Sequence, residues 1–203
     1  KYSRVLEIGC GRGNFLKLLH HGCEYHGIEP DPDSAKAAGR ILYAVYQGTF
    51  EEVSSKLPDN YFDLVICNDV VEHMAYPDDF LNAVKKKMSA DSFLVGSIPN
   101  VRYVRNLYSL LVAKDWNYCT GGGILDSTHL RFFTKKSLLR MFAETGYSVL
   151  DFKGINSDMI YPKTLRRLLG VFVIGAIIAV SFGFYSDIQY LQYGFSVKPK
   201  QDM

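Results

Sequence analysis

Three glycines and one acid near the start of the chain have the types and spacing to hold a nucleoside. Gly9, Gly11 and Gly13 join the apolar run 4–8 to a segment with helical spacing. Glycine allows a tight turn and a close backbone approach to a ligand, and a helix N-terminus just behind favours negative charge. Glu29 ends the next apolar run, where a carboxylate can accept hydrogen bonds from both hydroxyls of a ribose. These residues predict a cofactor site.

The glycine spacing separates two kinds of nucleoside cofactor. A dinucleotide fingerprint has its third glycine where this chain has Asn14. Here the third glycine is Gly13, and an acid, Glu7, precedes the set. The spacing disfavours an NAD-dependent oxidoreductase, which stays open as an alternative.

This ExGxGxG pattern resembles the first motif of the class I S-adenosylmethionine (SAM)-dependent methyltransferases. Residues 62–74 look like that family's fourth-strand motif, in particular that of the ubiquinone-biosynthesis enzymes. Residues 126–134 resemble a stretch of small-molecule and glycan-modifying members. The resemblance runs from Val5 to about Ser157. It implies an α/β fold, SAM as the cofactor and S-adenosylhomocysteine as its product.

The resemblance also implies which residues meet the cofactor. The glycine loop (residues 9–13) would lie under the methionine portion, Glu29 would hold the ribose, and Asn68 would approach the methionine end. Many members have an acid near the adenine amino group, whereas this chain has Thr49 and Phe50 there. The implied cofactor-binding residues are Glu7, Gly9, Gly11, Gly13, Glu29, Thr49, Phe50 and Asn68.

Two histidines are candidates for the transfer step. Methyl transfer is an in-line displacement, and holding the two reactants at attack distance supplies much of the acceleration. A hydroxyl acceptor also benefits from a general base, a role that suits histidine. His73 follows the fourth apolar run and His129 precedes a helix. A capping or packing His73, and a His129 that only hydrogen-bonds backbone, are the alternatives.

Other side chains could contact the acceptor. Arg131 could pair with an anionic acceptor or, equally, with a nearby acid. Aromatic rings suit sugar faces and apolar rings, but such a cluster could also be the core of an insertion. The aromatic candidates are Tyr103, chosen as a substrate residue, with Tyr108, Trp116 and Tyr118.

No metal site is expected from the spacing of ligand residues. The four cysteines are scattered, without a CxxC or Cys/His pattern, and indicate reduced thiols in a cytoplasmic protein. Asp31 and Asp33 lie beside prolines and are expected in a turn, and 78–79 is expected to begin a helix.

Apolar runs and helix-spaced segments alternate along the chain, which predicts βαβ units and a mostly parallel sheet. We expect one Rossmann-like domain over 1–203, with seven strands and helices on both faces. Residues 1–100 would form the cofactor-binding half and 101–134 an insertion on the acceptor side. Residues 158–187 would form an apolar helical insertion before the last strand.

The stretch 168–184 carries no charge and follows Lys163, Arg166 and Arg167. Its length approaches that of a membrane span, but a single crossing would separate the last strand from its sheet. A buried helix pair, a homodimer contact and a helix resting on a membrane surface remain as interpretations.

The composition is that of a globular protein, with 48% hydrophobic residues and a net charge of +2 that is spread along the chain. This pattern does not indicate a nucleic-acid partner. Because the chain starts at Lys1 and an expected strand begins at once, we expect a longer protein with a preceding segment. We predict methyl transfer to oxygen or nitrogen of a small molecule or glycan sugar. The alternatives are a SAM-binding module without transfer activity and the NAD-dependent oxidoreductase.

Overall fold

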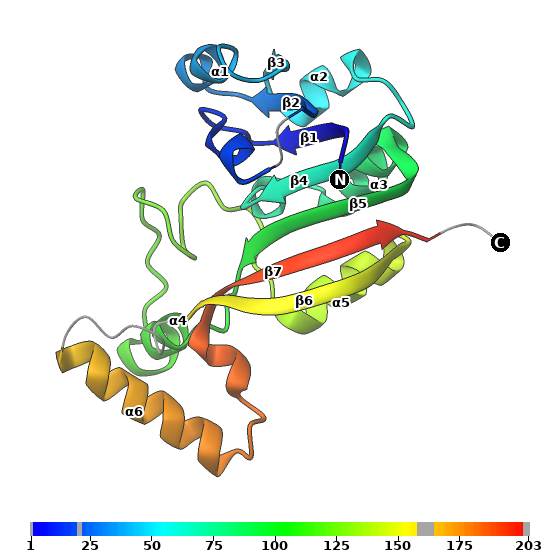
Figure 1. Cartoon of the computed structure of the whole chain (residues 1–203). Coiled ribbons are helices and arrows are strands. Elements are labelled where there is room, and N and C mark those ends of the chain that lie inside the picture. Colours follow the sequence, from blue (N-terminus) through cyan, green and yellow to red (C-terminus); the bar gives the residue numbers. More distant parts are fainter. Residues whose placement is uncertain (1, 20–21, 158–164, 201–203) are drawn as a thin grey trace.

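The computed structural model describes residues 2–19, 22–157 and 165–200, and only the backbone of 165–171 and 173. A seven-stranded sheet runs through it in the order β3-β2-β1-β4-β5-β7-β6 (Figure 1). Strands β1 to β5 pair in parallel, and β7 pairs antiparallel with β5 and β6. The strands are β1 Arg4–Ile8, β2 Glu24–Glu29, β3 Ala44–Gln47, β4 Phe62–Asn68, β5 Met88–Pro99, β6 Tyr147–Ser157 and β7 Tyr190–Pro199. The predicted fold class is confirmed.

Alternate residues of the central strands divide the core into two layers, because successive side chains of a strand point to opposite faces. Leu6 and Ile8 belong to the larger cluster, where they join apolar residues from three helices: α2 (Phe50–Val53), α3 (Pro77–Lys87) and α5 (Lys135–Glu144). Val5 belongs to the smaller cluster on the other face, with Tyr25 and with Ala38 of α1 (Pro32–Ala38). Helices therefore cover both faces, as predicted.

Capping residues explain where these helices begin and end. Asp31 accepts a hydrogen bond from the Ser34 backbone N–H at 2.9 Å, and Pro32 follows at the first helical position of α1. Gly146 lies just past α5 with a φ of +73°, the left-handed conformation in which glycine commonly ends a helix. The segment after the glycine loop is a 3₁₀ helix, η1 (Asn14–Leu18), where an α-helix was expected.

The expected insertion 101–134 is only partly helical. It contains α4 (Val104–Tyr108), the single π-turn η4 (Ser109–Ala113) and a long loop that leads to α5. The Asn100 backbone bridges to Phe133. The insertion therefore leaves the sheet at the carboxyl end of β5 and returns beside the same position.

The apolar segment differs from the buried helix pair that was considered. It forms one α-helix, α6 (Leu165–Val180), followed by η5 (Ser186–Gln189), and stands away from the sheet (Figure 1). Ile174 is buried, but Phe172, Val180 and Phe182 are 69%, 82% and 99% exposed. Within the described ranges no helix is both long and apolar enough to cross a bilayer.

Candidate active site

The glycine loop connects β1 to η1 and is held against the end of β2. The backbone N–H groups of Gly9 and Cys10 both donate to the Ile28 carbonyl, at 2.9 and 3.0 Å. Gly9 and Gly13 have φ values of +73° and +78°, which L side chains rarely adopt. These residues must be glycine for the backbone to turn here.

Glu29 stands at the carboxyl end of β2 with both carboxylate oxygens occupied by backbone donors. The N–H of Gly11 donates to Oε2 at 2.7 Å, and the N–H of Asp31 donates to Oε1 at 2.9 Å. These bonds fix the carboxylate beside the glycine loop and leave further lone pairs free to accept hydrogen bonds.

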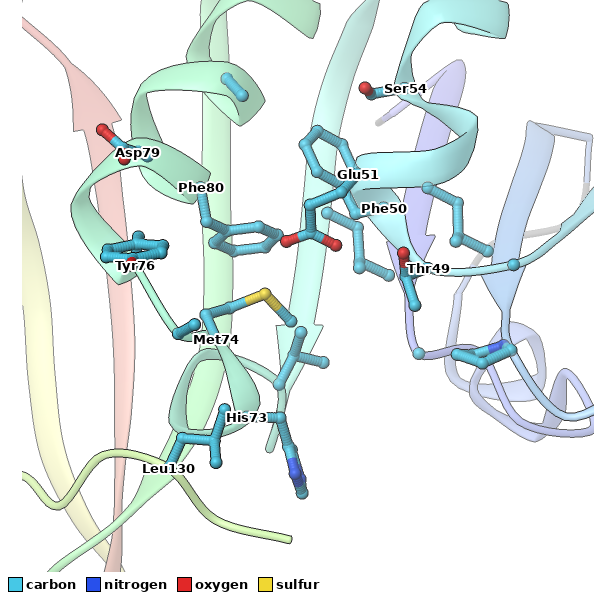
Figure 2. Close-up of a pocket in the computed structure, with 18 of the residues that line it drawn as sticks. Thr49, Phe50, Glu51, Ser54, His73, Met74, Tyr76, Asp79, Phe80 and Leu130 are labelled. Atoms are coloured by element: carbon cyan, nitrogen blue, oxygen red, sulfur yellow. The ribbon is translucent and has the colours of Figure 1, made fainter.

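A cavity of about 910 Å³ opens at the carboxyl ends of β1, β2 and β4. Its walls are α2 on one side and the segment 73–76 with α3 on the other (Figure 2). Of the cofactor-binding and catalytic residues predicted from the sequence, the cavity is lined by Gly9, Glu29, Thr49, Phe50 and His73. An opening at this edge of an α/β sheet is where such folds bind their ligands.

Thr49 and Phe50 have structural contacts besides lining this cavity. Thr49 caps α2 in a reciprocal arrangement with Glu52, whose carboxylate accepts from the Thr49 backbone N–H at 2.8 Å. The Phe50 ring is buried and meets Phe80 edge-on at 5.2 Å. The ring is therefore already packed, with a part of its surface facing the cavity.

The other predicted cofactor residues lie outside the cavity lining. Gly11 and Gly13 belong to the loop beside it. Glu7 is buried within β1, where its carboxylate accepts a hydrogen bond from the Tyr25 hydroxyl at 2.7 Å. Burial raises the pKa of Glu7 to about 7. Asn68 is not among the lining residues either, whereas the next residue, Asp69, is.

A second, smaller cavity of about 330 Å³ adjoins the first, and the two share Asp69 and His73. The tips of β4, β5 and β7 and the 119–129 loop surround it. Asp69 Oδ1 accepts hydrogen bonds from the Ser97 hydroxyl at 3.0 Å and from Gln192 Nε2 at 2.6 Å. The second cavity is lined by Asp69, Glu72, His73, Pro99, Gly122, Gly123, Ile124, Asp126, Thr128, His129, Leu191 and Gln192.

Both predicted catalytic histidines meet at this second cavity. The rings of His73 and His129 pack edge-on with centroids 4.8 Å apart. Glu72, which the sequence analysis did not single out, lies with them, and its Oε1 is 3.9 Å from His129 Nε2. The Glu72 side chain is 1% exposed and neither of its carboxylate oxygens has a hydrogen-bond partner. Burial raises the pKa of Glu72 to about 8, and the charge of Asp69 contributes.

The hydrogen bonds of the two imidazoles determine which nitrogen of each ring carries the proton. His73 Nδ1 lies 3.1 Å from the Thr128 carbonyl, and His129 Nδ1 lies 3.0 Å from the Ile124 carbonyl. A carbonyl only accepts, so each Nδ1 carries a proton and each neutral ring keeps its lone pair on Nε2. A lone pair and a carboxylate that face each other repel unless a proton or a cation lies between them.

These three residues could hold a metal ion. One ligand atom from each of Glu72, His73 and His129 lies within 4.8 Å of the others. Two histidines with Nδ1 bound to backbone carbonyls and one carboxylate form a ligand set used by divalent transition metals. Ligand atoms around a bound ion are about 3 Å apart, so the side chains would have to close in. The expectation of no metal stays a prediction, and this cluster is where it can be tested.

The predicted acceptor-side residues make contacts within the protein that do not indicate a bound acceptor. The Arg131 guanidinium donates to the carbonyls of Leu130 and Ala75, neither of which is an acid or a ligand. Tyr103 is buried at the start of α4, outside the linings of both cavities. Trp116 and Tyr118 pack on Phe132, with ring centroids 5.4 and 6.2 Å away. Trp116, Tyr118 and Phe132 therefore form an aromatic cluster of the insertion, whereas Tyr108 is 62% exposed.

A family model described as "Methyltransferase domain" matches residues 1–151 of the chain. The chain therefore belongs to this methyltransferase family. The class that the sequence resembles, the SAM-dependent methyltransferases of class I, is confirmed, and with it SAM as the cofactor.

Relatives and solved structures agree with this assignment. The ubiquinone biosynthesis O-methyltransferases of Aeromonas salmonicida and Schizosaccharomyces pombe are 28% and 25% identical over 76% and 75% of this chain. The matches span 66% and 58% of those relatives' own length. A SAM-dependent methyltransferase structure from Archaeoglobus fulgidus superposes with a TM-score of 0.68 at 22% identity, covering 97% of this chain and 86% of that one.

Proposed function

We propose that this domain methylates a hydroxyl of a small molecule, with SAM in the larger cavity and the acceptor in the smaller one. The observation that carries this proposal is the pair of adjoining cavities, which share Asp69 and His73. A methyl group presented at this junction faces two imidazoles and a buried carboxylate. Such a junction suits a transfer between two bound molecules held in line.

The cluster of Glu72, His73 and His129 supplies a proton acceptor for a hydroxyl. As the acceptor oxygen attacks, the carbon–oxygen bond forms and the bond between sulfur and the methyl carbon breaks, leaving S-adenosylhomocysteine. The hydroxyl proton passes to an Nε2 of His129 or His73. The imidazolium that results lies beside Glu72, and where Glu72 is ionised its carboxylate stabilises the positive charge, because opposite charges attract strongly in a buried site.

The acceptor class follows from the size of the site and from the names of the relatives. A cavity of about 330 Å³ accommodates a single ring. The relatives are named for O-methylation in ubiquinone biosynthesis, which favours a ring hydroxyl over a nitrogen. A glycan sugar, the other class considered from the sequence, presents hydroxyls of higher pKa and depends more on the base.

The test is transfer of a labelled methyl group from SAM to catechol and to simple hexosides, read by mass spectrometry. We expect the mass of the catechol product to rise by one methyl group, with the label on oxygen. Transfer to hexosides alone would redirect the proposal to glycans. Failure with every hydroxyl acceptor, while SAM binds, would contradict it and favour the binding-module alternative.

A second candidate is a cation-assisted version of the same reaction, favoured by the convergence of the three ligand atoms. A divalent ion held by Glu72, His73 and His129 would bind the acceptor oxygen and lower its pKa. Repeating the transfer assay after treatment with a chelator, and then with added Mg²⁺ or Mn²⁺, separates the two versions. Unchanged activity in chelator supports the histidines alone, and loss with recovery supports the ion.

We also propose that α6 and the following turn rest on a membrane surface, in preference to a homodimer contact. The exposed apolar side chains of Phe172, Val180 and Phe182 support this, as does the absence of charge over 168–184. The three basic residues before the uncharged stretch, Lys163, Arg166 and Arg167, would favour anionic lipids. Such a surface would bring an acceptor with an apolar tail to the site.

The expected result is co-flotation with vesicles that contain anionic lipid, weakened by Phe182→Ser combined with Phe184→Ser. Each exposed aromatic ring contributes about 1–3 kcal/mol when it leaves water, so losing two should weaken binding by at least tenfold. Leu18→Ser, another exposed apolar position, is the control. Equal flotation of the double variant, or a dimer in sedimentation that the double variant abolishes, would overturn the proposal.

A further inference from the structure

The 119–129 loop carries both carbonyl groups that orient the two histidines. Thr128, which accepts from His73, and Ile124, which accepts from His129, each lie two residues from Asp126 along the chain. The orientation of both imidazoles therefore depends on how this loop is folded. The loop is anchored at its base, where the Ser127 N–H donates to the Cys119 carbonyl at 2.8 Å.

The Asp126 carboxylate joins the two arms of this loop. Its Oδ2 accepts from the Gly122 backbone N–H at 2.7 Å, and its Oδ1 accepts from the Thr128 backbone N–H at 2.9 Å and from the Thr128 hydroxyl at 2.6 Å. Its own backbone carbonyl accepts from the His129 N–H at 3.0 Å. One side chain thus holds the segments that carry both carbonyls.

A strongly bound carboxylate suits this role. Hydrogen bonds from the Thr128 hydroxyl, then from backbone N–H groups, lower the pKa of Asp126 to about 2. The group is therefore ionised at neutral pH, so these hydrogen bonds are charge-assisted.

We infer that Asp126 is a positioning residue for methyl transfer, which holds the Thr128 and Ile124 carbonyls so that His73 and His129 both present Nε2 to the reaction centre. Asp126 acts through the loop backbone and touches neither imidazole nor the acceptor's reacting oxygen. This inference rests on the proposed function, because it assigns a purpose to the Nε2 lone pairs. It also predicts a property that exists without any acceptor: both rings should be Nδ1–H tautomers.

The test measures the tautomers and the kinetics of matched variants. Nitrogen-15 NMR of the chelator-treated protein, with His73 and His129 assigned by substitution, reports which nitrogen of each ring is protonated. Wild type should show Nδ1–H on both rings. In Asp126→Ala we expect both rings to gain the Nε2–H form, because their carbonyl acceptors are no longer held in place.

The kinetic effect of Asp126→Ala should resemble the effect of removing a hydrogen-bond partner that orients an active-site imidazole. Asp126→Ala should lower kcat by about 10- to 100-fold, while the Kd of SAM stays within about twofold. Asp126→Asn keeps an oxygen for Thr128 but not for Gly122, so its kcat should be intermediate. Asp115→Ala, an exposed acid in the same insertion, should change nothing.

Several results would overturn the inference. These are Nε2–H rings in wild type, Nδ1–H rings that survive in Asp126→Ala, or a loss of SAM affinity and melting temperature in step with kcat. A joint loss of SAM affinity, melting temperature and kcat would mean that Asp126 stabilises the whole fold. Asp126→Asn, a milder change, tests the same point. If wild type methylates no hydroxyl, the proposed function fails, but the tautomer comparison still decides the role of Asp126.

Discussion

Replacing Glu29 by alanine is expected to weaken SAM binding by about 10- to 100-fold, since hydrogen bonds to a charged group contribute about 1.5–3 kcal/mol. The carboxylate is already fixed by the N–H groups of Gly11 and Asp31, at 2.7 and 2.9 Å, so little ordering is needed when a ribose arrives. Alanine removes the acceptor and also frees the Gly11 N–H. Titration calorimetry with SAM and S-adenosylhomocysteine measures both effects as a change in Kd.

A carboxylate on the same strand provides the control. Glu24 begins β2, at the far end from the cavity, and its carboxylate accepts from the Tyr61 hydroxyl at 2.5 Å. Glu24→Ala should bind SAM as wild type does. If Glu29→Ala also kept its affinity within twofold, the ribose would have to be held elsewhere in the cavity.

Replacing Glu72 by glutamine is expected to lower kcat by about 100-fold and, at the same time, to stabilise the free protein at high pH. The first effect follows because glutamine has the shape of glutamate but cannot ionise, so it offers no carboxylate to stabilise an imidazolium. The second follows because the carboxylate is buried without a hydrogen-bond partner. A residue kept for function at a cost to stability behaves in this way.

The direction of the pH effect follows from the pKa of Glu72, which burial raises from 4.5 to about 8. Between these values the folded state binds more protons than the unfolded state, so the free energy of unfolding falls as the pH rises. Wild type loses this contribution progressively between pH 4.5 and about pH 8, at up to about 1.4 kcal/mol per pH unit. Glutamine does not titrate, so the variant keeps its stability through this window.

Thermal unfolding in the presence of a chelator, from pH 5 to pH 9, measures the gap between the two proteins. We expect Glu72→Gln to gain on wild type by a few kcal/mol across this range, or about 5 °C or more in Tm. Glu144→Gln, an exposed carboxylate on α5, should follow the wild-type curve. A gap that stayed constant with pH would show that Glu72 is not held in its neutral form by burial.

Local sequence features were enough to predict most of the fold. The apolar runs of β1, β2 and β4 lie next to one another in the sheet, and each is bounded by glycines or polar residues that end a strand. Gly9 and Gly13 could be recognised as a loop from their residue type, because glycine readily adopts the positive φ that both have in the structure. The short α2 was missed because four residues carry too little periodicity, although Thr49 and Glu52 form a capping box.

The reaction centre could be predicted only in part. His73 and His129 were each chosen from their own segments, but their meeting depends on how the insertion folds back over the carboxyl end of β4. His73 lies 55 positions before Thr128, whose carbonyl orients it, and His129 lies 57 positions after Glu72, which it faces. Glu72 was passed over because an acid beside a histidine gives no sign in the sequence of being buried without a partner.

For the apolar segment 168–184, the sequence predicted the secondary structure but not whether the helix is buried or exposed. Its composition predicted a helix, and α6 is that helix. Composition alone could not separate a buried helix from an exposed one, since both are apolar around their whole circumference. The exposure of Phe182 and Val180 decides between these two, and what covers those side chains is the subject of the flotation experiment.

The most direct test of the central claim, a SAM site between the glycine loop and Glu29, is parallel calorimetric titration of wild type with SAM, S-adenosylhomocysteine and NAD. We expect both adenosyl ligands to bind at a single site and NAD not to compete with them. Binding of NAD alone would contradict this expectation, because the cavity would then hold the cofactor of the oxidoreductase alternative.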